Sequence, residues 1–165
     1  MRALDPPAAK TVTTLLALTA AGTAAYWIAF FAAGNALHSS ETDVYAAFEH
    51  AFPAADAWMA AAAVTAAVGL ARRRDWAVLA GIAAGSALVF LGLLDVLFSL
   101  EQGLYARPSA AMALETAINL FCLSMGPSCI AYFWRHRDRL NSPLTWSAAR
   151  VRRRCPGVYR HISPG

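Results

Sequence analysis

Residues 76–94 read WAVLAGIAAGSALVFLGLL, and this stretch without a charged residue decides the fold class. A helix needs about 20 apolar residues to cross the hydrocarbon core of a bilayer. Three further uncharged stretches, 11–34, 57–71 and 116–134, have the same character. With 58% hydrophobic and 15% charged residues in a length of 165, the chain is too apolar for a soluble domain. The sequence therefore predicts an all-α, integral membrane four-helix bundle.

The second stretch is too short to span a bilayer alone, so it must reach back to about residue 51 and include Asp56. We expect spans at about 11–34, 51–71, 76–98 and 112–134 in one domain, 1–140, followed by a basic tail, 141–165. A signal peptide cleaved near Gly34-Asn35-Ala36 is the alternative for the first span. Because the apolar core of a signal peptide is roughly 7–15 residues long, we expect the longer first stretch to remain as a helix.

Basic residues gather on one side of the predicted spans. Of the 14 Lys and Arg residues, only Arg107 falls on the other side. The rest are Arg2, Lys10, Arg72, Arg73, Arg74, Arg135, Arg137, Arg139, Arg150, Arg152, Arg153, Arg154 and Arg160. Cytoplasmic flanks retain basic residues during insertion, so we expect both termini in the cytoplasm and the spans in the inner (plasma) membrane. The tail should contact anionic lipid rather than nucleic acid, because no recognition motif accompanies its charge.

The loop between the first two spans has structure of its own. Ser40-Glu41-Thr42-Asp43 has the form of a helix-capping box, which predicts a short helix beginning near Asp43. Its mixture of apolar and acidic residues is typical of an interfacial helix. Pro53 then either kinks the chain or opens the second span from a first-turn position, and the kink is our preferred interpretation.

Each of the three later spans carries a stripe of small residues on one helical face. The stripes are Asp56, Ala60, Ala63 and Ala67; Gly81, Gly85, Leu88, Gly92 and Asp95; and Glu115, Asn119, Cys122, Gly126 and Cys129. Small stripes let membrane helices approach closely, and Gly81 with Gly85 forms a GxxxG pair. We predict packing roles for Gly81, Gly85, Gly92 and Gly126. The same residues would serve packing within the bundle or between two copies in a homodimer, and both remain open.

If the stripes face inward, Asp56, Asp95 and Glu115 converge near the outer end of the bundle, with Asn119 below them and Tyr26 arriving from the first span. Carboxylates at this depth cannot face lipid cheaply. Three of them cannot all be ionised at low cost either, so we expect a shared proton or a bound cation. Glu49 and His50, with His38, lie on the same side and are weak candidates for a metal site, so the metal stays unknown.

A structural interpretation of these acids competes with the functional one. One or more of them would cap a helix or pair with Arg107. Glu115 is most open to this interpretation because the predicted span places it in the first helical turn, where negative charge suits the helix dipole. Asp95 lies near the carboxyl end of its span, where the dipole disfavours it.

The sequence lacks the motifs of several common redox, haem-binding and hydrolytic sites. There is no CxxC pair, no histidine pair within the spans and no Ser-His-Asp arrangement with a nucleophile elbow, so no cofactor is expected. Cys122 and Cys129 are too far apart along one helix to form a disulfide and are interpreted as small packing residues. Cys155, in the basic tail, is interpreted as a free thiol, with acylation as the alternative.

Two segments carry a family resemblance. They are Tyr45-x-x-Phe48-Glu49-x-x-Phe52-Pro53-x-x-Asp56-x-Trp58-Met59 and Gly92-Leu93-x-Asp95-Val96-Leu97-Phe98-x-Leu100-Glu101-x-Gly103-x-Tyr105. In these segments the chain resembles a group of small bacterial four-span integral membrane proteins to which no activity is assigned. The resemblance implies four spans and leaves function open.

Three hypotheses follow for function. The leading one is a binding or transport-like module that holds a proton, a cation or a small solute at Asp56, Asp95, Glu115 and Asn119. The second is a structural or assembly subunit whose small stripes bind another membrane protein. The third is a membrane enzyme acting on a lipid or isoprenoid, with carboxylates as general acid and base. This hypothesis ranks last, because an interior lined by Ala and Gly predicts tight packing without a pocket. The sequence therefore favours a protein that is not an enzyme.

Overall fold

A computed structural model describes residues 6–33, 42–107 and 109–140. Its helices are α1 (Pro6–Ala33), α2 (Asp43–Glu49), α3 (Phe52–Ala71), α4 (Trp76–Glu101), the short 3-10 helix η2 (Leu104–Ala106) and α5 (Ala110–Leu140). No strand occurs among these residues. Four helical stretches are long and apolar enough to cross a membrane, the second running from α2 through α3. The prediction of an all-α four-helix membrane bundle is confirmed.

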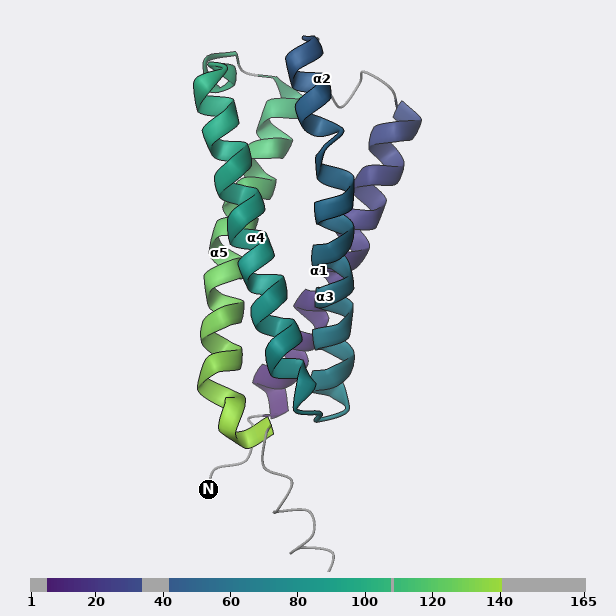
Figure 1. The fold of residues 1–165 in the computed structure, drawn as a ribbon, viewed down its shortest axis with the longest axis vertical. Coiled ribbons are helices and arrows are strands. Elements are labelled where there is room, and N and C mark those ends of the chain that lie inside the picture. Colours follow the sequence, from purple (N-terminus) through teal and green to yellow (C-terminus); the bar gives the residue numbers. More distant parts are fainter. Residues whose placement is uncertain (1–5, 34–41, 108, 141–165) are drawn as a thin grey trace, which may run out of the picture.

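The four long helices pack in sequence order (Figure 1). Helix α1 packs on α3, α3 on α4, and α4 on α5. The remaining side of the bundle, between α1 and α5, has no comparable packed interface. The bundle is therefore closed on three sides and open on the fourth.

Large apolar side chains cover much of the outer surface of the bundle. Leu18, Ile28, Leu79 and Phe90 are between 62% and 76% exposed, and they come from α1 and α4. Water would wet such a continuous apolar surface at a high cost, whereas lipid chains wet it readily. The surface thus fits a multi-pass membrane protein.

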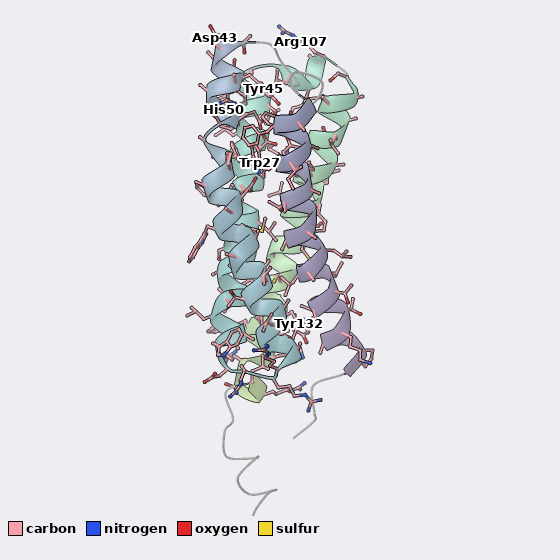
Figure 2. All side chains as sticks on the ribbon, turned by 90° about the vertical axis from the view of Figure 1, so that its right-hand side faces the viewer. Trp27, Asp43, Tyr45, His50, Arg107 and Tyr132 are labelled. Atoms are coloured by element: carbon pink, nitrogen blue, oxygen red, sulfur yellow. The ribbon has the colours of Figure 1, made fainter. Side chains whose placement is uncertain are left out.

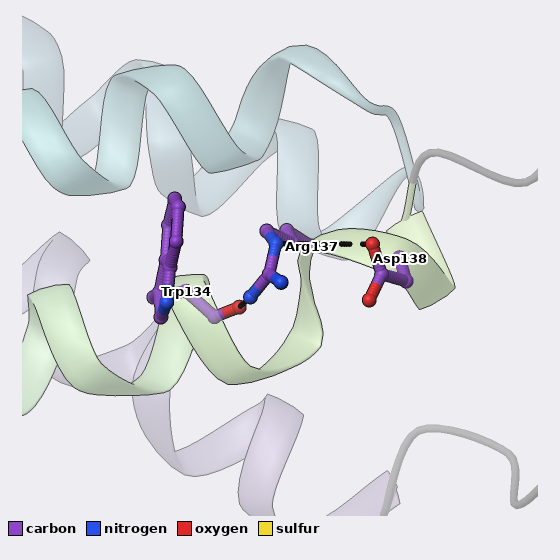
Figure 3. A network of polar contacts seen from close by, with 3 residues as sticks. All are labelled: Trp134, Arg137 and Asp138. Carbon is purple, nitrogen blue, oxygen red and sulfur yellow. Dashed lines mark hydrogen bonds and ion pairs between the residues drawn. The ribbon is translucent and has the colours of Figure 1, made fainter.

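Both ends of the described chain lie at one end of the bundle, together with the α3–α4 turn (Figure 1). Near this end Arg137 lies over the Trp134 ring, 4.1 Å from its centroid, and donates to the Trp134 carbonyl at 2.7 Å. Its Nε atom is 3.8 Å from an Asp138 carboxylate oxygen (Figure 3). Helix α2 and Arg107 lie at the opposite end (Figure 2).

The short helix α2 begins at Asp43, as predicted. Its N-cap is Thr42, whose hydroxyl accepts the Tyr45 N–H at 3.2 Å. Ser40 and Glu41 of the proposed capping box lie outside the described residues, as do 34–36, His38 and the tail with Cys155.

The preferred interpretation of Pro53 as a kink is wrong. Helix α2 ends at Glu49, the chain turns at His50 and Ala51, and Pro53 stands in the first turn of α3. A first-turn residue needs no N–H group for the helix ladder, so proline is well tolerated there. The second alternative, a proline that opens the span, is the correct one.

Candidate functional site

The glycines predicted to serve packing lie where α4 meets α5 within one chain. A Cβ atom added at Gly81 would be 2.1 Å from the Phe133 ring, and one at Gly85 would be 2.8 Å from the Gly126 carbonyl oxygen. Beside them the Cys129 thiol donates to the Gly81 carbonyl at 3.4 Å. Only glycine permits so close an approach, so α4 and α5 are in close contact at this level of the bundle.

Toward the α2 end, by contrast, the bundle contains a cavity of about 620 Å³. Residues from all five α-helices line it: Leu15, Leu18, Thr19, Gly22, Thr23, Tyr26, Trp27, Glu49, Phe52, Asp56, Met59, Leu88, Leu91, Gly92, Asp95, Leu114, Glu115, Ala117, Ile118, Asn119, Phe121 and Cys122. The expectation of a tightly packed interior is therefore wrong in this half. The small residues draw α4 to α5, but α1 does not close against α5, and the space between them stays hollow.

Four carboxylates line the cavity, one from each of four helices. Glu49 comes from the end of α2, Asp56 from the first turns of α3, Asp95 from α4 and Glu115 from α5. The Tyr26 phenol, on α1, lies within electrostatic range of all four. The structure thus gathers every carboxylate that the sequence proposed for ligand or ion binding, including Glu49, the weaker candidate, which is 6% exposed.

Asp56 is held by a residue that the sequence analysis did not propose. The Trp27 indole nitrogen on α1 donates to Asp56 Oδ2 at 2.7 Å. A hydrogen bond to an ionised group contributes about 1.5–3 kcal/mol, and this one joins α1 to α3 beside the cavity. Trp27 therefore both positions the carboxylate and forms part of the wall.

Glu115 is held in the same manner from α2. The Tyr45 hydroxyl donates to Glu115 Oε1 at 2.5 Å. Tyr45 is 1% exposed and packs with Leu104 and Met112, so α2 covers the end of the bundle by inserting this ring (Figure 2). The sequence had suggested only an interfacial position for Tyr45, because no local pattern reveals a partner 70 residues away.

Asn119 lies one helical turn from Glu115 and close to Asp95. The approach to Asp95 falls short of hydrogen-bond geometry, and the Asn119 Nδ2 amide has no hydrogen-bond partner among the described residues. The side chain is 3% exposed and lines the cavity. A buried amide without a partner costs about 1–3 kcal/mol, so this donor is available to an occupant of the cavity.

Glu115 does not lie in the first helical turn, where the sequence placed it as a candidate helix cap. Helix α5 begins at Ala110, earlier than the predicted span, and the Ser109 hydroxyl caps it by accepting the Met112 N–H at 3.0 Å. Glu115 consequently lies in the second turn, 5% exposed, facing the cavity. Arg107 is exposed at the end of the bundle (Figure 2), and within the described ranges no ion pair joins it to any acid.

The described residues around the cavity form no compact metal site. Among the described residues no three His, Cys, Asp or Glu side chains are close enough together to hold a metal ion. His50 is exposed and does not line the cavity. The carboxylates are distributed around the wall, so they would contact different parts of a larger occupant.

The part of the cavity farther from α2 is apolar. Leu15, Leu88 and Leu91 line it, and the two threonines beside them use their hydroxyls within α1. Thr19 donates to the Leu15 carbonyl at 2.8 Å, and Thr23 donates to the Thr19 carbonyl at 3.0 Å. Such back-bonding is common for threonine in membrane helices, and it leaves a wall with little capacity to bind polar groups.

Comparison with known proteins does not assign the chain to a family. The chain matches no protein-family model, no curated protein and no solved structure.

Proposed function

We propose that this protein binds a small organic cation in the carboxylate-lined cavity of its bundle. One observation carries the proposal: four carboxylates line the cavity, and no basic residue in the described part of the chain lines it with them. Carboxylates gathered in a largely buried site repel one another, so they share protons or attract a cation. A cationic occupant would relieve this repulsion.

The size and walls of the cavity favour an organic cation over a bare ion. A volume of about 620 Å³ lies in the range of small-molecule sites, roughly 300–1,000 Å³. Tyr26 and Trp27 line the cavity beside the acids, and aromatic faces attract ammonium groups. In the empty state, protons shared among the carboxylates would lower the net charge.

The function is proposed for the inner (plasma) membrane, with both termini in the cytoplasm and the cavity in the outer half. The distribution of basic residues supports this orientation. Single cysteines introduced as Arg107→Cys and Arg74→Cys, each in a Cys155→Ser background, test it. In intact cells a membrane-impermeant maleimide should label the first and spare the second, and the reverse pattern would contradict the orientation.

Calorimetric titration of the purified protein in lipid nanodiscs tests the binding function. Choline serves as the organic cation, with sodium and magnesium ions for comparison. Choline should bind the parent, and Asp56→Asn and Asp95→Asn should each weaken binding about tenfold or more, as expected for loss of about 1.4 kcal/mol or more. Asp138→Asn is the matched control, since Asp138 is exposed at the far end of the bundle. Equal binding by parent, control and both cavity variants would contradict the proposal.

A second candidate function gains support from the hollow interior. An enzyme acting on a lipid or isoprenoid needs a pocket for an apolar chain, and the cavity has an apolar part beside its carboxylates. Such an enzyme would use one carboxylate as general acid and another as base. Turnover of a lipid extract by the parent, absent in Asp95→Asn, would favour this candidate over binding alone.

A further inference from the structure

The cavity has two ends of different chemistry. Its carboxylates lie near the level of Tyr26 on α1, and its apolar wall continues along α1 as far as Leu15. At 1.5 Å of rise per residue these levels are roughly 16 Å apart. An occupant that fills the whole space must therefore be polar at one end and apolar over a comparable length.

The cavity also opens sideways, toward the lipid. Its rim on α1 includes Leu18, 62% exposed, and its rim on α5 includes Leu114 and Phe121, 42% and 40% exposed. These two helices share no major packed interface. Each rim residue contributes to the cavity wall and to the outer apolar surface, so a chain dissolved in the membrane could enter without crossing water.

The polar end of the cavity has a hydrogen-bond donor as well as carboxylates. The Asn119 Nδ2 amide, 3% exposed and without a hydrogen-bond partner among the described residues, lines the cavity beside Asp95. An amide N–H needs an acceptor. A head group that carries an oxygen next to its cationic nitrogen would satisfy Asn119 and the carboxylates together, with Tyr26 and Trp27 against the cation.

We propose that the ligand is a membrane-dissolved amphiphile whose head pairs a cationic nitrogen with a hydroxyl or ester oxygen, and whose alkyl chain occupies the apolar part of the cavity after entering between α1 and α5. This inference rests on the proposed cation-binding function and specifies the class of its ligand.

Gly22 supplies the discriminating substitution. It lines the cavity on α1, and a Cβ atom added there would meet nothing within 4 Å. Gly22→Leu should fill the apolar part without touching a carboxylate. Ala24→Leu is the matched control, because Ala24 is exposed on α1 and does not line the cavity. Ala117→Leu narrows the opening from the α5 rim and replaces Gly22→Leu if that variant fails to fold.

Choline and its N-hexyl analogue, in which a hexyl group replaces one methyl, are titrated into nanodiscs holding each variant. Burial of each methylene is worth roughly a threefold to fourfold gain in affinity, so the hexyl analogue should bind the parent and Ala24→Leu at least roughly tenfold more tightly than choline. In Gly22→Leu most of this gain should vanish, so that the ratio of the hexyl-analogue affinity to the choline affinity falls to about twofold or less.

Partition of the hexyl chain into lipid also raises apparent affinity, but it is the same for all variants. An equal gain in the parent, Gly22→Leu and Ala24→Leu would show that the chain lies in bulk lipid. That result would overturn the amphiphile proposal and leave the cation site standing. Absence of choline binding in the parent would overturn both.

Discussion

Gly81→Ala tests the closest contact between α4 and α5. The added methyl carbon would lie 2.1, 2.2 and 2.5 Å from three carbons of the Phe133 ring, whereas carbon atoms prefer about 3.5–4.0 Å. Phe133 is fully buried, so the ring must retreat by about 1 Å or more within a packed interface. Overpacking of this kind costs about 1–3 kcal/mol, and we expect the variant to unfold at correspondingly lower denaturant concentration in mixed micelles.

The stability lost in Gly81→Ala depends on the clash with the Phe133 ring. Phe133→Leu in the Gly81→Ala background should therefore restore part of that stability. Residues in direct contact show coupling energies of about 0.5–3 kcal/mol. Gly22→Ala is the control, because it makes the same chemical change where no atom lies within 4 Å. It should be neutral or stabilising by up to about 1 kcal/mol through helix propensity.

Two results would refute this reasoning. If Gly81→Ala unfolds like the parent, the helices do not approach as described. If the Gly81→Ala and Phe133→Leu effects simply add, Phe133 is not the group that meets the new methyl. Either outcome would mean that α4 and α5 pack in a different register. Asp95 would then lie elsewhere relative to Glu115.

Three other substitutions have defined expectations. Tyr45→Phe removes the hydrogen bond to Glu115 and should destabilise the bundle by about 1.5–3 kcal/mol in thermal melting; an unchanged melting temperature would show that α2 is not anchored by this bond. Trp27→Phe should cost more in the parent than beside Asp56→Ala, since a double-mutant cycle isolates their shared hydrogen bond; independent, additive losses would argue against it. Gly103 has a φ of 63°, so Gly103→Ala should cost about 1–2 kcal/mol and Gly103→Asn less, and equal melting of both variants and the parent would contradict a left-handed conformation there.

The helical repeat explains why much of the site could be predicted. Because side chains at steps of three and four share a helical face, the stripe from Glu115 to Cys129 could be read from sequence, and all five of its members are buried. The same reasoning placed Asp95 and Asp56 beside it. Helix starts were less accurate: Ser109 begins α5 before the apolar stretch does, which moves Glu115 out of the first turn.

Contacts between helices that are distant in sequence could not be predicted from the helical repeat. Trp27 and Tyr45 reach Asp56 and Glu115 only because of how α1 and α2 are placed against the bundle, and no local pattern specifies that placement. The cavity escaped prediction for a related reason. Small residues indicate that helices can approach, but the sequence does not say that the major interface of α1 is with α3.

The order of helix packing has a consequence for how the protein is made. Each major interface joins a long helix to the next one along the chain: α1 to α3, α3 to α4, and α4 to α5. A nascent chain can thus complete every interface as soon as the following helix leaves the ribosome, and proteins rich in such local contacts fold quickly. The first and last helices never have to find each other in the bilayer, and the side of the bundle where they would have met is the side on which the cavity opens.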